Sequence, residues 1–374
     1  MLDQLPPELV LAVLEHLAPP LDYPSRARVA RINLYNLMRV SKRLYTLANP
    51  IFWREVAVES ANEAVRLLAF LREGSAHDIK QHIETLQVSN TFRDSRPTVS
   101  QIQVLIALLP RAKRLELARV SEIQAGLSVL AEHDFEALWL CDLFLVAALP
   151  PARFTVLTEL SLEGVDMAQG TLATFLTPEI CPSLRALSLY EINSKFLNAT
   201  VHDLSNRMFA QLDLLQLFLR DISPSSLPIP LLQSTTTPVV LIMDDGLLSL
   251  SKASAGAALH LAYFVSCSPR HEYGNKFSSV FTTSYQPRTL HSSVHLHPER
   301  LAALDPEPEN HAALLEDVKT TLKICEERGV EVVWHEQDTT RLFAVSPSLW
   351  HWAKYEKVKL ALEHGGGNGA SMSG

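Results

Sequence analysis

Apolar residues near the start of the chain recur with helical spacing. The first block runs from Leu9 to Leu17 at steps of one, three and four, which places its apolar side chains on one face of an α-helix. Pro6 and Pro7 stand just before it, where proline is tolerated at a helix start. Pro19 and Pro20 stop the helix. The pattern therefore predicts a short amphipathic helix over this block.

A second apolar block runs from Leu34 to Ile51, again at steps of three and four. Ser41 inside it is a good N-cap residue, so the block predicts two short helices rather than one. Asn49-Pro50 is expected to end the later helix, and the large apolar side chains of Phe52 and Trp53 follow. Three helices this short need a partner surface, or the rest of the chain, to bury their apolar faces.

The body of the chain repeats a shorter pattern: an apolar residue, two variable residues, Leu, one variable residue, then Leu or Val. Alternation places the last two apolar residues on the same side of a short strand. The spacing between units, 22 to 29 residues, is typical of a leucine-rich repeat, whose units must stack to bury their apolar faces. The alternative is a conventional α/β sheet of six parallel strands. The first Leu of each strand is Leu86, Leu115, Leu138, Leu160, Leu187 and Leu215.

The helix-like stretches between these units include 100–109 and 170–175. After residue 220 the spacing loosens, and Asn310 is expected to cap a helix over 311–327 that Gly329 ends. A terminal helix over 349–362 is expected to cap the open end, before a Gly/Ser-rich tail. The later candidate strands are 239–243, 259–265, 294–296 and 330–334.

Composition indicates a folded, soluble protein. Of the 374 residues, 47% are hydrophobic and 20% charged, and the net charge of −8 argues against broad nucleic-acid binding. The longest charge-free run contains four prolines, so no membrane span is expected. The four scattered cysteines form no CxxC pair and suit a reducing compartment, and no secretory signal is visible. We therefore expect the protein in the cytoplasm, the nucleus or both.

Catalytic and cofactor motifs are absent from the sequence, so no catalytic residue, cofactor or metal site is predicted. His291, His295 and His297 form the densest histidine group, but no acidic or cysteine partner lies at ligand spacing. The acidic clusters 244–246 and 305–309 contain Gly or Pro, which favours solvated turns over paired catalytic carboxylates.

Basic residues gather in the N-terminal region. They are explained either as a solvated helix face or as a contact for an acidic partner surface. The set comprises Arg26, Arg28, Arg31, Arg39, Lys42 and Arg43.

The segments LPPELVLAVLEHL and LMRVSKRLYTLANPIFWREV resemble an F-box, with the VSK and FW elements in the family's order. The chain departs from the family at 18–33, where the link between the first two helices is longer than usual. The body resembles the irregular leucine-rich repeats often found behind an F-box. It lacks the usual Asn ladder, since those positions hold Thr91, Val120, Leu143, Val165, Ile192 and Arg220. An ordinary amphipathic helical hairpin is the alternative for the N-terminus.

The resemblance implies an α/β fold in which a three-helix F-box precedes a leucine-rich-repeat-like solenoid. The expected domains are 1–56 for the F-box with its insertion at 18–33, 57–345 for the solenoid, 346–363 for the C-terminal helix or cap, and 364–374 for a disordered tail. The implied role is substrate receptor of a Skp–cullin–F-box ubiquitin ligase, bound to the Skp adaptor and through it to the cullin, with an unidentified target protein.

Carried over by position, the adaptor-facing set is Leu5, Pro6, Leu9, Val13, Leu14, Leu37, Val40, Ser41, Leu44 and Trp53. The pattern does not separate side chains that face the adaptor from those that pack the three helices together. Two other functions stay open: a leucine-rich-repeat scaffold acting outside the ligase, and a small-molecule enzyme on an α/β sheet.

Overall fold

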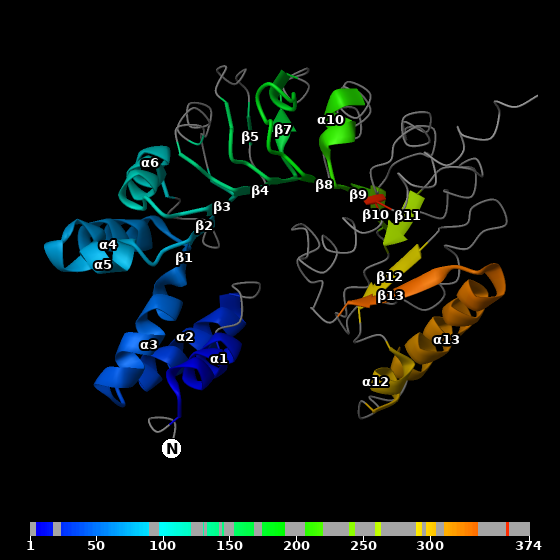
Figure 1. Ribbon diagram of the computed structural model, residues 1–374, viewed down its shortest axis with the longest axis horizontal. Coiled ribbons are helices and arrows are strands. Elements are labelled where there is room, and N and C mark those ends of the chain that lie inside the picture. The colour runs from blue at the N-terminus through cyan, green and yellow to red at the C-terminus, as the bar shows by residue number, and fades with distance from the viewer. Residues whose placement is uncertain are drawn as a thin grey trace, which may run out of the picture. The chain divides into compact units, whose positions relative to one another are not determined.

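The computed structural model divides the chain into two compact units, described separately below (Figure 1). Unit 1 comprises Met1–Leu157 with Val165–Ala168, and unit 2 comprises Thr158–Gly164 with Gln169–Gly374. The structure describes residues 5–17, 24–89, 97–120, 130, 133–141, 144–145, 153–167, 174–190, 206–219, 239–243, 259–262, 289–293, 297–303, 310–335 and 357–358.

Unit 1 begins with three helices, called the helical module here: α1 (Pro7–Leu17), α2 (Pro24–Met38) and α3 (Lys42–Arg54). Their apolar faces form one small core, as the steps of three and four predicted. Leu11, Leu37, Met38, Leu47 and Phe52 pack against it partly buried. The fully buried members are Val10, Leu14, Leu34, Leu44, Ala48 and Ile51.

Two predicted boundaries in the helical module were wrong. Helix α2 begins at Pro24, inside the stretch 18–33 expected to be an insertion, so most of that stretch lengthens the second helix. Helix α3 does not end at Asn49-Pro50 but runs through Pro50 to Arg54. Proline removes one N–H donor from a helix. Burial of Ile51 in the module core, with Phe52 packed against it, holds the last turn in place.

Helix α3 passes into the first strand without a linker. Its C-terminal residue Arg54 is followed at once by β1 (Glu55–Val58), whose Val56 and Val58 are buried. The predicted boundary between 56 and 57 therefore cuts through a strand. The strand itself was not predicted, because Val56-x-Val58 lacks the Leu-x-Leu signature.

In unit 1 the strands β1, β2 (Thr85–Ser89), β3 (Arg114–Ala118) and β4 (Ala137–Cys141) pair in parallel and in chain order. The repeated leucines set the register, since Leu86 pairs with Leu115 and Leu115 with Leu138. Helices α4 (Ala61–Arg72) and α6 (Val99–Leu108) lie between strands in the chain, with the short η2 (Gly74–Ala76) and α5 (His77–Lys80). A small second sheet pairs β5 (Phe144–Leu145) with β7 (Asp166–Met167).

Unit 2 repeats the arrangement with β6 (Glu159–Glu163), β8 (Ala186–Tyr190) and β9 (Leu214–Leu219), where Leu160, Leu187 and Leu215 pair in register. The sheet continues in chain order through β10 (Val239–Met243), β11 (Leu259–Ala262), β12 (Thr289–Ser293) and β13 (Glu331–His335). Helices α10 (Asn206–Gln211), α12 (Pro298–Ala303) and α13 (Asn310–Arg328) complete the described part.

Equivalent backbone bonds join the starts of successive strands. In unit 1 each of these bonds joins an amide just before one strand to a carbonyl just before the preceding strand, at 2.8 Å. The amides of Glu84, Lys113 and Glu136 donate to the carbonyls of Arg54, Glu84 and Lys113, in that order. In unit 2 Arg185 donates to Thr158 at 2.9 Å, and Asp213 donates to Arg185. This regularity shows that the recurring sequence pattern specifies a recurring backbone geometry. Both units are therefore α/β structures built on parallel strands.

The leucines of the pattern are buried, and two ladder positions are filled by apolar side chains instead of Asn. Leu86, Leu115 and Leu187 are fully buried. Val120 and Val165 are also buried, so apolar packing replaces a side-chain hydrogen-bond ladder at these two sites. The other four ladder positions, Thr91, Leu143, Ile192 and Arg220, lie outside the described residues.

The C-terminal predictions have mixed outcomes. Strand β12 precedes the expected 294–296, which lies outside the described residues. Strand β11 covers Leu259–Ala262 of the expected 259–265, whose last three residues lie outside the described residues too. Helix α13 ends before Gly329, whose φ of +66° and amide bond to Glu326 at 3.2 Å confirm the left-handed stop. Of the expected helices at 170–175 and 349–362, only 174–175 and 357–358 are described, and both pairs are helical. The expected tail from 364 lies outside the described residues.

Candidate functional site

Nine of the ten side chains predicted to face an adaptor separate into an outer and an inner set, and Trp53 belongs to neither. On α1, the side chains of Leu9 (54% exposed) and Val13 (39%) point to solvent, and Leu5 and Pro6 just before it are exposed too. Val40, in the turn between α2 and α3, is 68% exposed. These residues are available to a partner without disturbing the module core.

The inner set holds the three helices together. Leu14 and Leu44 are almost fully buried in the module core, and Leu37 packs against it half-buried. Ser41 caps α3, because its Oγ accepts a hydrogen bond from the Leu44 amide at 3.1 Å. Capping of this kind stabilises a helix by about 1 kcal/mol. The capping role predicted for Ser41 is confirmed.

Trp53 faces the sheet-forming part of unit 1. Its indole stacks on the Phe70 ring of α4 with ring centroids 5.4 Å apart, and Phe52 meets it edge-on at 5.2 Å. The side chain is half-buried. Trp53 therefore joins α3 to the first helix of the sheet.

Three exposed apolar side chains were missed. Ile32 (52% exposed) and Tyr35 (53%) project from α2, and Tyr45 (49%) projects from α3. They lie off the steps of three and four that place Leu34, Leu37 and Leu44 toward the core, so the predicted apolar block did not include them. The sequence signal that could have identified them is a second apolar face on the helix, in addition to the one face that packs against the core.

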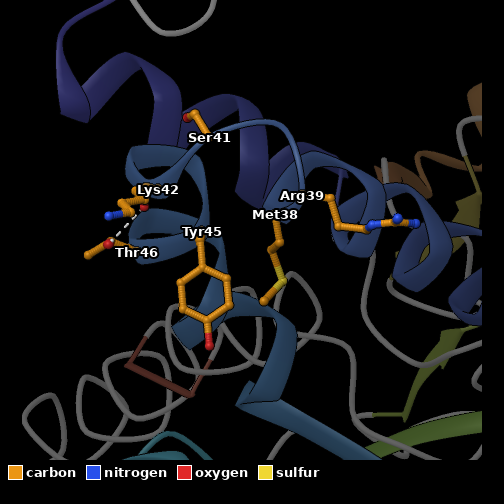
Figure 2. Close-up of a pocket in the computed structure, with 6 residues that line it drawn as sticks. All are labelled: Met38, Arg39, Ser41, Lys42, Tyr45 and Thr46. Atoms are coloured by element: carbon orange, nitrogen blue, oxygen red, sulfur yellow. Dashed lines mark hydrogen bonds between the residues drawn. The ribbon is translucent and has the colours of Figure 1, made fainter.

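A shallow pocket of about 490 Å³ lies at the turn between α2 and α3. Figure 2 shows Met38 and Tyr45 side by side, with Arg39 and Lys42 extending away on opposite sides. The Thr46 hydroxyl donates to the Lys42 carbonyl at 3.0 Å. The lining residues are Met38, Arg39, Ser41, Lys42, Tyr45 and Thr46.

Two arginines of the basic set, Arg43 and Arg31, are engaged within unit 1, and so is Arg54. Arg43 donates to the Leu5 carbonyl at 2.6 Å and ties the start of α3 to the segment before α1. Arg54 pairs with Glu15 at 3.3 Å. Arg31 donates to the Glu55 carbonyl and lies over the Phe52 ring. Burial lowers the pKa of Arg31, and the Glu55 carboxylate opposes that shift.

Arg39 and Lys42 differ from these arginines. Both are exposed, and neither forms an ion pair with any residue that the structure places. Arg39 lies over the Tyr35 ring, with its guanidinium carbon 5.9 Å from the ring centroid. The turn thus presents two cations beside exposed aromatic and aliphatic side chains. The side chains of Arg26 and Arg28 lie outside the described residues.

Among the described residues, no group of three or more His, Cys, Asp and Glu has the arrangement of a metal site. Of the histidine group, the His297 ring packs against Trp334 with centroids 4.9 Å apart, while His295 lies outside the described residues. Burial raises the pKa of the Cys181 thiol to about 12, which leaves it protonated and unreactive at neutral pH. Among the described helices, none has the length and hydropathy of a membrane span.

Comparison with known proteins bears on the N-terminal region. Residues 2–59 match the F-box-like family model, a match that covers the helical module and the whole of β1. No curated protein matches the chain. The chain therefore carries an F-box-like domain, and its apolar outer surface lies within that domain.

Proposed function

We propose that this chain is the substrate-recognition subunit of a Skp–cullin–F-box ubiquitin ligase. In this role the F-box-like domain binds the Skp adaptor and, through it, the cullin scaffold. The observation that carries the proposal is the solvent-facing apolar surface of α1, with Leu9 and Val13 exposed, in a domain that matches the F-box-like model. A domain that matches the F-box-like model suggests a role in binding the Skp adaptor.

Apolar side chains left in water on a small helical domain favour burial against a partner. Leu9 and Val13 are four residues apart and so lie on one face of α1, while Val10 and Leu14 fill the module core from another face. The module therefore keeps its own core when it binds. Burying each exposed leucine or valine adds up to about 1.5–3 kcal/mol.

The remainder of the chain is proposed to be an irregular leucine-rich-repeat solenoid that holds a target protein. Three observations support it: the strands of each unit follow chain order, neighbouring strands are parallel, and the repeated leucines pair in register. Units that contact only their neighbours give this strand order. A doubly wound sheet, by contrast, reverses its strand order at a switch point.

The proposed mechanism is proximity rather than bond chemistry by this chain. Holding a target near the ubiquitin-charged conjugating enzyme raises the local concentration of the target lysine. The chain would then need no catalytic residue or cofactor of its own, and we propose that it acts in the cytoplasm, the nucleus or both. Side chains of the repeats would select the target protein, and no sequence motif identifies that protein.

Co-purification of the full chain with the Skp adaptor tests the proposal. Wild-type chain and a Leu9→Glu, Val13→Glu variant are each mixed with purified adaptor and separated by size exclusion. We expect a stoichiometric complex with the wild type and none with the variant, while circular dichroism of the two chains agrees. A folded wild-type chain that does not bind the adaptor would refute the ligase role and leave the scaffold outside the ligase as the better account.

A further inference from the structure

The stretch 18–33 is the place where the chain is longer than the F-box pattern, and most of it forms the first part of α2. Of its three arginines, Arg31 has a side chain that the structure describes, and that side chain is half-buried. Its guanidinium donates to the carbonyl of Glu55, which lies 24 residues later and is the first residue of β1. The lengthened helix therefore contacts the sheet-forming part of unit 1.

The Arg31 side chain spans the junction between α3 and β1. Its guanidinium carbon lies 5.7 Å from the centroid of the Phe52 ring in the last turn of α3, while its Nη2 donates to Glu55 in β1. Phe52 in turn packs against the module core. Arginine suits this place because a planar guanidinium is able to stack on an aromatic ring and donate hydrogen bonds at the same time. One residue thereby holds α2, α3 and β1 together.

The Glu55 carbonyl points away from the rest of the sheet. Strand β1 is the first in the sheet order, and it pairs with β2. The carbonyl of the preceding residue, Arg54, accepts a hydrogen bond from the Glu84 amide on the β2 side at 2.8 Å. Because Glu55 is extended, with φ −124° and ψ 128°, its own carbonyl points to the opposite, outer edge. Arg31 therefore occupies an edge position that a further strand would otherwise use.

These contacts decide between the two explanations of the basic residues in the case of Arg31. A solvated helix face would leave its guanidinium in water, and a contact for an acidic partner would direct it outward, as its exposed neighbour Ile32 is directed. Arg31 instead turns toward the junction and is half-buried there. Removing a charged donor from water is costly unless an acceptor meets it, and the Glu55 carbonyl supplies that acceptor.

We propose that the lengthened α2 is a brace that fixes the angle between the helical module and the sheet of unit 1, with Arg31 as its positioning residue. The inference rests on the proposed function, because this angle matters to a receptor that holds a target near a charged enzyme. Without the brace, the direct passage from Arg54 into Glu55 becomes a hinge supported by the Trp53–Phe70 stack. Residues at the ends of elements absorb hinge motions of this kind.

A distance measurement within unit 1 of the full chain tests the brace. Spin labels are attached to Ala12→Cys on α1 and Ala107→Cys on α6, both exposed positions, and the chain without these two cysteines gives the background from native thiols. The variant is Arg31→Met, which keeps an aliphatic stem and removes the donors and the charge. The control, Arg66→Met, makes the same change at an exposed position of α4. Thermal unfolding of every chain is measured alongside.

We expect wild type to give one narrow distance and Arg31→Met to give a distribution about two-fold broader, because a hinge replaces a braced junction. Arg31→Lys should give an intermediate width, since an ammonium keeps a donor and the charge but not the planar stack. Arg66→Met should match wild type. Adaptor binding by the unlabelled variants should be unchanged, because Leu9 and Val13 lie on the outer face of α1.

Three results would overturn the inference. A distribution as narrow as that of wild type in the folded Arg31 variants would show that the junction holds its angle unaided. Equal broadening in Arg66→Met would indicate a general loosening of unit 1. Broadening together with lost adaptor binding would assign Arg31 to the module core. A wild-type chain that gives a narrow distance and binds no adaptor would instead overturn the proposed function and leave the brace in place.

Discussion

The Trp53 indole stacks on the Phe70 ring with their planes 12° from parallel. One residue belongs to the last turn of α3 and the other to α4, so the pair joins the helical module to the first helix of the sheet. Aromatic pairs of this kind contribute about 0.5–1.5 kcal/mol beyond their area burial. Trp53 therefore has a structural role in unit 1.

Replacing Trp53 with Ala should lower the free energy of unfolding of unit 1 by about 3 kcal/mol, since a large half-buried ring and its stacking are lost. Trp53→Phe should retain most of that stability. Urea unfolding followed by circular dichroism measures the change, with Tyr45→Ala, at an exposed position, as the control. Unchanged urea stability combined with lost adaptor binding would place Trp53 in the interface instead.

Leu9 and Leu14 should behave oppositely although both are leucines of one helix. Leu9→Ser should leave the melting temperature unchanged and weaken adaptor binding by at least about ten-fold, because its side chain is exposed. Leu14→Ser should lower the free energy of unfolding by about 3 kcal/mol or more, because it opens the module core. Calorimetry and an adaptor-binding assay on both variants check this. Equal effects in both assays would contradict the division into two faces.

Cys181 should make stability fall at alkaline pH. Its pKa is raised by burial to about 12, from 9.0, so between these values the unfolded thiol has lost its proton while the native thiol keeps it. The unfolded state then binds fewer protons, and the free energy of unfolding falls by up to about 1.4 kcal/mol per pH unit. The stabilisation is complete below pH 9 and is lost as pH rises towards 12.

Urea midpoints of wild type and Cys181→Ala from pH 8 to 11 measure this contribution. The difference between the two proteins should shrink as pH rises, because only wild type carries the Cys181 term. Cys325, whose pKa burial raises to about 11, remains in both proteins and cancels in the comparison. A difference that stays constant with pH would show that the Cys181 thiol ionises equally in both states.

Gly329→Ala should lower the free energy of unfolding by about 1 kcal/mol through backbone strain alone. Its φ of +66° suits glycine, while no atom lies within 4 Å of where a Cβ would stand, so crowding makes no contribution. Gly74→Ala is the matched control, since that position is equally open and lacks a positive φ. Thermal unfolding of both variants separates strain from volume.

The sequence predicted the sheet better than the helical module. Leu-x-Leu units with fixed alternation specify both the strand and its side facing the core, so Leu86, Leu115 and Leu187 were placed correctly. The predicted end of α3 was wrong because the local rule for proline takes no account of packing. Since Ile51 is buried in the module core, α3 continues beyond Pro50. Strand β1 was missed because Val56-x-Val58 carries the same alternation with valines in place of leucines.

The candidate site was predicted as a set of residues but not as a surface. Helical spacing identified Leu9, Leu14 and Leu44 together, since each lies at an apolar step. Separating outward from inward residues needs the angles between three helices, which spacing does not contain. Exposure then divides the set, and it adds Tyr35 and Tyr45, whose apolar character had no assigned face.

The direct passage from Arg54 into Glu55 fixes the phase between a helix and a strand. A helix advances by about 100° per residue, and a strand turns its side chains by about 180°. One residue inserted at this junction would either rotate α3 relative to β1 or direct the side chains of Val56 and Val58 to the solvent side of the sheet. We therefore expect insertions and deletions in unit 1 to be tolerated in its loops and not between Arg54 and Glu55.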